Sequence, residues 1–340
     1  MNNLKKILLT LFILVSLFLA WNLFGPTVST PQDKYFFVYT GSDYEDVKSG
    51  LTSQKIIAND FFFDIICKAI DYPNHIKPGR YEIHEGGNLI SLIRKLKSGN
   101  QKEVRFIINK LRTKEDLAKM IGEIFECDSI EAIQFLTNND SLAAYQLDSN
   151  TIMSIIIPNS YLFWWNGSIA KIMKRLITQH DHFWEGERTQ KAKARGMTPL
   201  QIYTLASIVE EETNMKNDKP KVASVYINRL QKRMKLEADP TVKYAMRQFE
   251  LKRVLHGHLS YPSEYNTYQQ IGLPPGPICT PSINTIDAVL DAPATDYLFF
   301  VAKPDFSGYS NFSNNYQEHI KNAKLYQQAL DQYLINKSTR

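Results

Sequence analysis

The feature that most constrains this 340-residue chain is an uncharged apolar run from Ile7 to Phe24. In a helix these 18 residues rise about 27 Å at ~1.5 Å per residue, close to the ~30 Å hydrocarbon core of a bilayer. Lys5 and Lys6 precede the run, and Gly25-Pro26 follows it. The pattern predicts a helix over 7–24 that crosses a membrane once.

A cleavable signal peptide is the alternative interpretation of the same run, because the run is short and lies at the N-terminus. However, no small-x-small cleavage site follows it, since Trp21, Leu23 and Phe24 occupy that region. An uncleaved anchor is therefore favoured. Lysines before the span place residues 1–6 in the cytoplasm by the positive-inside rule. We expect the rest of the chain to lie outside a bacterial cytoplasmic (inner) membrane.

The composition excludes several classes of protein. With 44% hydrophobic and 22% charged residues, the chain is ordered and long enough for two folded units. A net charge of +5 is too small for a dense basic face, so no nucleic-acid partner is expected. The three cysteines are widely spaced and odd in number, which argues against a disulfide framework or a zinc knuckle.

Short strands and helices alternate after the span and predict a small α+β unit over residues 35–109. Aromatic and β-branched residues indicate the strands, and apolar residues at helical spacing indicate the helices. The expected strands are 35–40, 81–84 and 103–109, and the expected helices are 43–51, 61–70 and 88–97.

A second region begins at Thr113, where Asp116 completes a capping pair, and runs through two helices to about residue 137. The aromatic segment 155–165 is broken by Pro158, so a loop or short strand is expected there. Its aromatic residues could stack on sugar rings or be buried in the core. A helix follows over 169–183, and the basic run 188–195 is typical of a solvated helix face. The aromatic residues in question are Tyr161, Trp164 and Trp165.

The helix predicted over 198–213 ends in three consecutive glutamates. Thr198-Pro199 is a strong helix start, with a hydroxyl N-cap and a proline in the first turn. Projected at 100° per residue, Glu211 points away from the apolar face, whereas Glu210 and Glu212 lie on its two flanks. Acids at a helix C-terminus oppose the macrodipole, so helix stability does not account for them.

Two interpretations of the glutamates remain open at this point. All three could be surface acids paired with nearby lysines at 216, 219 and 221. Alternatively, desolvation beside the apolar face raises the pKa of Glu210 and makes it a proton donor near neutral pH.

A series of short motifs follows in order along the second half of the chain. They are Ser207–Thr213, Val222–Leu230, Ala238–Tyr244, Tyr265–Tyr268, Gly272–Ile278, Thr280–Ser282, Tyr297–Val301, Asn311–Ser313 and Glu318–His319. Together they resemble the endolytic murein transglycosylases of the MltG type. Such enzymes cut peptidoglycan, and members carry a LysM-like domain between a membrane anchor and the catalytic domain. The resemblance therefore implies an α+β protein with an anchor at 7–24, a LysM-like domain at 35–109 and a catalytic domain at 110–335.

The resemblance implies that Glu210 is the catalytic acid and base. It would protonate the oxygen that leaves MurNAc C1 and then accept the proton of the same sugar's C6 hydroxyl, leaving a 1,6-anhydro end within a nascent glycan strand. Glycan strands are the expected substrate, and wall-synthesis enzymes such as penicillin-binding proteins are candidate partners. The motif positions implied to bind substrate are Glu212, Asn228, Arg229, Asp239, Tyr265 and Asn266.

Two positions depart from the family pattern. Glu211 stands where a lysine is common, and the segment Asn109–Arg112 lacks the usual Glu-Gly turn. The scheme needs no metal or cofactor, and the chain has no HExxH motif. Two alternatives remain: a muramidase in which water attacks the same bond, and an anchored glycan-binding module without catalysis.

Overall fold

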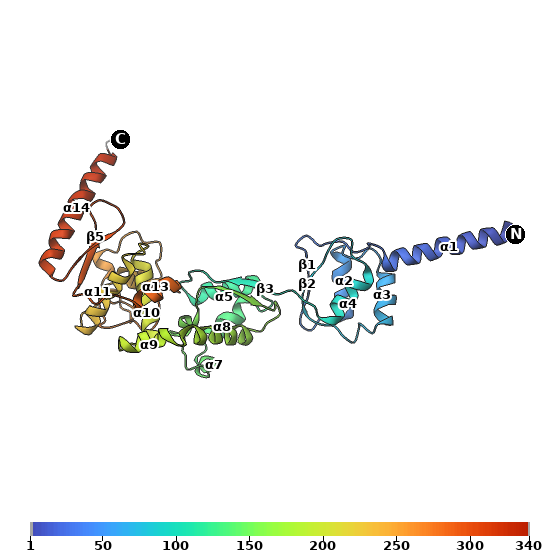
Figure 1. Cartoon of the computed structure of the whole chain (residues 1–340), viewed down its shortest axis with the longest axis horizontal. Helices are drawn as coiled ribbons and strands as arrows, with labels where there is room; N and C mark the ends of the chain where they lie inside the picture. Colours follow the sequence, from blue (N-terminus) through green and yellow to red (C-terminus); the bar gives the residue numbers. More distant parts are fainter. Residues whose placement is uncertain (1–2, 339–340) are drawn as a thin grey trace. The chain divides into compact units, whose positions relative to one another are not determined.

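The computed structural model describes residues 3–338 and combines many helices with three two-stranded sheets (Figure 1). This mixture of helix and strand agrees with the predicted α+β class. The elements, in chain order, are α1 (Asn3–Phe24), β1 (Tyr35–Val38), α2 (Tyr44–Ser53), α3 (Asp60–Ala69), β2 (Gly79–Glu82), α4 (Leu89–Ser98), β3 (Val104–Ile107), α5 (Lys114–Ile124), α6 (Ser129–Thr137), α7 (Asn139–Ala143), η1 (Ile152–Ile155), β4 (Ser160–Phe163), α8 (Ile169–Trp184), α9 (Glu187–Ala194), α10 (Pro199–Glu212), α11 (Lys219–Gln231), α12 (Asp239–Ala245), η2 (His256–His258), α13 (Ile283–Leu290), β5 (Phe299–Ala302), β6 (Ser310–Ser313) and α14 (Tyr316–Ser338).

The chain divides into two compact units, each described here by itself. Unit 1 comprises residues up to 106 together with 122–128 and 161–168, and unit 2 comprises 107–121, 129–160 and the chain from 169 onward. Two short segments from the middle of the sequence thus belong to the N-terminal unit. Residues 1–2, part of the segment predicted to be cytoplasmic, lie outside the described residues.

Helix α1 carries no charged residue from Ile7 to its end at Phe24, as the sequence predicts. Its mean hydropathy is 2.5 over an 18-residue window, and none of that window is buried inside the protein. By length and composition, α1 could span a membrane.

Unit 1 is built on the antiparallel pair β1 and β2, in which Tyr35 lies opposite Glu82 and Val38 opposite Gly79. Side chains from α2, α3 and α4 fill the core beside this pair, including the fully buried Phe63 and Ile93. Side-chain caps begin these helices, because an Asp or Asn oxygen accepts a backbone N–H in the first turn of each.

The aromatic segment that could have contacted sugars is mostly buried in unit 1. Trp165 is 6% exposed and packs against Phe37 and Tyr39, with ring centroids 4.7 and 5.1 Å apart. Tyr161 is buried as well, whereas Trp164 is half exposed. Core packing therefore accounts for two of the three candidates.

Unit 2 is organised around α10, which begins as predicted. Thr198 and Gln201 form a reciprocal capping box, with Pro199 in the first turn. Every residue of α10 from Ile202 to Val209 is at most 2% exposed. The helix is therefore buried on all sides, and α11, α12 and α13 pack against it or one another.

The prediction of a solvated face for the basic run 188–195 is wrong for its two arginines. Arg188 forms a two-pronged ion pair with Asp287 on α13, at 2.9 and 3.2 Å. Arg195 donates to the backbone carbonyls of Leu290 and Ala292 at the end of that helix. Ala192 between them is fully buried. The run thus joins α9 to α13, because charged groups can pack at an interface when their donors are satisfied.

Candidate active site

The three consecutive glutamates lie at the C-terminal end of the buried helix α10. Successive helical residues are rotated by about 100°, so three in a row point in three different directions. The helix is surrounded by protein, and each acid therefore meets a different set of neighbours. The three directions follow from the sequence alone, whereas the residues that each glutamate meets depend on the tertiary fold.

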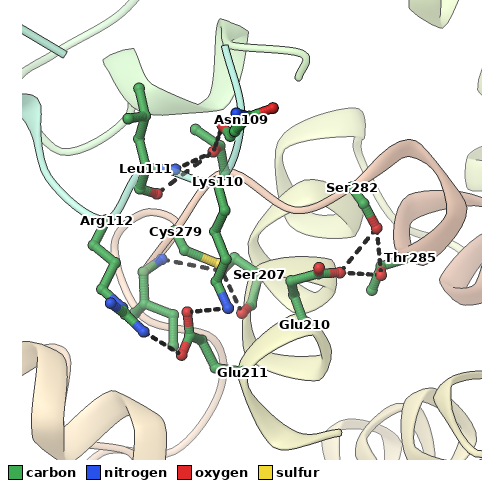
Figure 2. A network of polar contacts seen from close by, with 12 residues as sticks. Asn109, Lys110, Leu111, Arg112, Ser207, Glu210, Glu211, Cys279, Ser282 and Thr285 are labelled. Atoms are coloured by element: carbon green, nitrogen blue, oxygen red, sulfur yellow. Dashed lines mark hydrogen bonds and ion pairs between the residues drawn. The ribbon is translucent and has the colours of Figure 1, made fainter. Parts of the chain in front are cut away.

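Glu210 lies in a closed polar cluster. Its Oε2 atom is 2.8 Å from Nζ of Lys219 on α11 and accepts a hydrogen bond of 3.0 Å from Ser282. Thr285 on α13 also donates to this oxygen and accepts from Lys219 at 2.6 Å. The side chains of Glu210 and Lys219 are only 14% and 11% exposed. Figure 2 shows Glu210 pointing toward Ser282 and Thr285.

The predicted rise in the pKa of Glu210 is wrong. Burial alone raises the pKa of this carboxyl, but the hydrogen bonds from Lys219 and Thr285, with the charge of Lys219, outweigh it and lower the pKa below its ordinary value. The small residues Ala206 and Ser207, on the preceding turn of α10, are fully buried, and the group that reaches the carboxylate is a lysine. Glu210 is thus ionised at neutral pH.

Glu211 is not solvated, contrary to the helical projection. Its carboxylate is 2.6 Å from Nζ of Lys110 and 3.4 Å from Nη2 of Arg112, and its side chain is 17% exposed (Figure 2). The segment that carries these cations is held by the loop before α13, because Leu111 and Thr280 exchange hydrogen bonds of 2.8 and 2.7 Å. That loop in turn contacts α10, since the backbone N–H of Ile278 donates to the hydroxyl of Ser207 at 3.0 Å. Thus the two departures from the family pattern, Glu211 and the segment Asn109–Arg112, form ion pairs with each other.

Glu212 faces a cleft of about 300 Å³ within unit 2. Its Oε1 atom accepts a hydrogen bond of 2.8 Å from the hydroxyl of Tyr226 on α11. The cleft offers carboxylates, a guanidinium and aromatic faces, which suit the polar edges and apolar face of a sugar. Its lining residues are Glu212, Tyr226, Arg229, Leu236, Glu237, Asp239, Tyr268, Phe299, Phe300 and His319.

Burial raises the pKa of Glu212 to about 7, and the nearby negative charge of Asp239 adds to this rise. The hydrogen bond from Tyr226 acts in the opposite direction, since it stabilises the carboxylate, but it is the smaller effect. Glu212 can therefore hold or release a proton near neutral pH. The property predicted for Glu210 is found two residues further along the helix.

Two other residues predicted to bind substrate lie in the same cleft as Glu212. Asp239 accepts a hydrogen bond of 2.7 Å from the hydroxyl of Tyr268. Arg229 is 7% exposed and donates to the carbonyls of Leu298, Lys235 and Leu236, and to the carboxylate of Glu237 at 2.9 Å. Arg229 thus fixes the walls of the cleft.

The remaining three predicted residues do not line this cleft. Asn228 donates from its amide to the carbonyls of Thr295 and Tyr297, both at 2.9 Å. Asn266 is fully buried, where its side chain closes the 259–268 loop. The ring of Tyr265 packs against Tyr244, with centroids 4.8 Å apart. In this structure all three hold the fold around the site.

Several cleft residues that were not predicted to bind substrate lie within the motifs that resemble the family. They are Tyr226, Tyr268 and His319. Glu237 gave no signal. Within residues 3–338, no group of three or more His, Cys, Asp or Glu side chains is placed to hold a metal ion.

Comparison with known proteins now identifies the family. The model of the YceG-like family matches residues 36–325, which is most of the chain. The chain belongs to the YceG-like family. A crystal structure of a YceG-like protein from Listeria monocytogenes is similar to it, with a TM-score of 0.56 and 25% identity, covering 85% of this chain and 99% of that one.

Two bacterial relatives of this YceG-like protein carry the name endolytic murein transglycosylase. The Bacillus subtilis (strain 168) protein is 28% identical over 330 residues, covering 89% of each chain. The Streptococcus pneumoniae (strain D39) protein is 23% identical over 318 residues, which are 83% of this chain and 56% of that one.

Proposed function

We propose that this YceG-like protein is an endolytic murein transglycosylase. It cleaves the MurNAc–GlcNAc bond within nascent glycan strands, leaves 1,6-anhydro-MurNAc ends and so terminates strand elongation. The family and the names of its relatives support the reaction. The cleft containing Glu212 carries the proposal, because it combines a carboxyl that titrates near pH 7 with groups suited to a sugar.

Glu212 is the proton donor best supported by its surroundings. A general acid must be protonated at the working pH and must face the substrate. Glu212 meets both conditions, whereas Glu210 is held as a carboxylate by Lys219, Ser282 and Thr285. Glu210 remains the catalytic residue predicted from the family motif, and the experiment below decides between the two glutamates.

The reaction needs only one carboxyl group for proton transfer. The protonated acid gives its proton to the GlcNAc oxygen as the bond from that oxygen to MurNAc C1 breaks. An oxocarbenium-like centre develops at C1, and the C6 hydroxyl of the same sugar attacks it. The carboxylate takes the proton that this hydroxyl loses, so the enzyme ends in its starting state.

Asp239 and Tyr268 fit a supporting role in this scheme. The negative charge of Asp239 keeps the pKa of Glu212 high, and Tyr268 orients that aspartate through its hydroxyl. A hydrolase would instead use a second carboxylate to activate water or to attack C1. The product distinguishes the two reactions, because attack by water leaves a reducing end and attack by the C6 hydroxyl does not.

The protein's position at the membrane is also part of the proposal. Helix α1 anchors the chain in the bacterial cytoplasmic membrane, with its lysine-preceded end in the cytoplasm and both units outside. Unit 1, with its antiparallel strand pair and three helices, serves as a LysM-like module between the membrane and the catalytic unit. Wall-synthesis enzymes such as penicillin-binding proteins are proposed as partners at the same surface.

Product analysis of two isosteric variants tests the assignment. On uncrosslinked glycan strands, Glu212→Gln should lower the rate of release of anhydro ends by about 10²- to 10⁴-fold, the usual contribution of a general acid. Glu210→Gln should keep the reaction in the fraction of protein that remains folded. Mass spectrometry identifies the ends, and thermal melting reports the folded fraction.

The outcomes separate the possible errors. Full activity in Glu212→Gln together with loss in folded Glu210→Gln would return the catalytic role to Glu210. Reducing ends from the wild-type protein would indicate a muramidase. Binding of glycan without turnover by the wild-type protein would contradict catalysis altogether.

A further inference from the structure

Helix α1 is joined to unit 1 by side-chain packing as well as by the chain itself. Leu23, near the end of α1, packs against the core of unit 1. Phe18, more than one turn earlier, places its ring 6.0 Å from the ring of Phe62 on α3 in an edge-to-face contact. Figure 1 shows α1 leaving unit 1 beside α3. Side-chain packing therefore fixes the position of α1 relative to α3.

If α1 spans a bilayer, the contact between Phe18 and Phe62 brings α3 close to the membrane. Phe18 precedes the end of α1 at Phe24 by six residues, or about 9 Å along the helix. The uncharged span is only about 27 Å long, already shorter than a typical hydrocarbon core of ~30 Å. Moving the last turns of α1 out of the bilayer would expose apolar surface to water, which is unfavourable. These turns are therefore expected to stay in the bilayer.

The face of α3 beside this contact is apolar and exposed. Phe61 is 63% exposed and Ile65 is 46% exposed, and their i, i+4 spacing puts them on one face of the helix. The Phe61 ring also touches Phe62, with centroids 5.5 Å apart. Asp60 at the start of α3 is exposed, which suits the headgroup level better than the hydrocarbon interior.

A cleft of about 510 Å³ lies next to the end of the anchor on α4. Phe24, 68% exposed, lines it together with the basic side chains of Arg94 and Lys95. The Arg94 side chain is exposed. An apolar group and cations at the end of a membrane span are the arrangement that meets acyl chains and headgroup phosphates.

We infer that unit 1 docks on the outer leaflet of the bilayer that α1 spans, with Phe61 and Ile65 of α3 inserted among the headgroups and Arg94 facing lipid phosphates. This inference rests on the proposed anchoring by α1 and is independent of the catalytic assignment. The occupant of the exposed face is lipid, because the face continues the surface of a helix that is itself in lipid.

Fluorescent labelling of the full-length protein in phosphatidylcholine–phosphatidylglycerol vesicles tests the docking. The native cysteines Cys67, Cys127 and Cys279 are all buried, so a thiol-reactive NBD dye should label an introduced surface cysteine selectively. Phe61→Cys and Ile65→Cys should each show blue-shifted emission and quenching by doxyl-labelled lipids.

Two matched labels serve as controls. Tyr39→Cys replaces a residue that is 58% exposed and directly follows β1, a strand that Figure 1 shows on the side of unit 1 away from α1. This label should show water-like emission without quenching. Leu14→Cys replaces a residue of α1 that is also 58% exposed and should be quenched strongly.

Water-like emission at 61 and 65, with quenching at 14, would overturn the docking while leaving the anchor intact. An unquenched label at 14 would overturn the anchor and the docking together. Release of anhydro ends by the same preparations reports separately on the proposed reaction.

Discussion

Two carboxyl groups separated by one residue on α10 have opposite environments. Glu210 meets a lysine and two hydroxyl donors, all of which stabilise its charged form. Glu212 meets one phenol and the negative charge of Asp239, beside an open cleft. Burial raises the pKa of both groups, but only at Glu212 does it prevail.

The difference shows that burial alone does not identify a proton donor. A half-buried glutamate at the end of a helix becomes an acid only where no cation pairs with it directly. Here the cation is Lys219 on α11, which is nearby in sequence, whereas the hydroxyl groups come from the distant 282–285 turn.

The largest expected effect is on stability, at Glu210. Glu210→Gln leaves Lys219 buried without its counter-charge, and breaking such a pair costs about 3 kcal/mol. Because Lys219→Met removes the orphaned cation, the double variant Glu210→Gln/Lys219→Met should recover part of the loss. Equilibrium unfolding of the four proteins in this double-mutant cycle measures the coupling, and additive losses would show that the pair is not coupled.

The pH dependence of stability gives an independent check on the same pair. The pKa of Glu210 is lowered in the folded state, so its contribution to stability is fully present above the unfolded pKa of ~4.5 and is lost as pH falls through the folded value. Glu210→Gln should therefore flatten the acid side of the stability curve.

The second prediction concerns the pH dependence of activity. If Glu212 donates the proton, the rate should fall about tenfold per pH unit above pH 7, as this group with a pKa of about 7 loses its proton. If Glu210 were the donor, the fall would begin below pH 4.5, because its pKa is lowered. The rate of release of anhydro ends between pH 4 and about 9 distinguishes the two.

A smaller effect is expected at Glu211. Lys110→Glu and Glu211→Lys each place like charges together and should each lower the free energy of unfolding by about 1 kcal/mol, since this pair is only partly buried. The double variant Lys110→Glu/Glu211→Lys restores opposite charges and should recover most of the loss. Unchanged stability in both single variants would show that the ion pair contributes nothing.

Much of the fold could be predicted because it depends on local signals. The hydroxyl cap at Thr198, the break at Pro158 and the apolar period of α8 each specify an element within one or two turns. The exposure of α10 could not be predicted in this way. Its helical projection shows one apolar face, but protein covers it on all sides.

The site was only partly predictable for the same reason. Family motifs brought Glu212, Arg229 and Asp239 to notice, and the structure gathers these three in one cleft. The choice between two glutamates depends on Lys219, Tyr226 and Thr285, whose positions are set by tertiary packing. A motif identifies residues by their order in the chain, but it does not show which charged groups surround each of them in the fold.

The smallest effect is the one most specific to Glu212. Tyr226→Phe removes the hydroxyl that donates to this carboxylate but keeps the buried ring. Because that hydrogen bond lowers the pKa of Glu212, its loss should raise the pKa further and move the alkaline limb of the activity profile to higher pH by up to about one unit. Tyr268→Phe is the comparison variant: its hydroxyl contacts Asp239, so its loss reaches Glu212 only indirectly and should move the limb less. A limb that moves in Tyr268→Phe but not in Tyr226→Phe would mean that the titrating group is not Glu212.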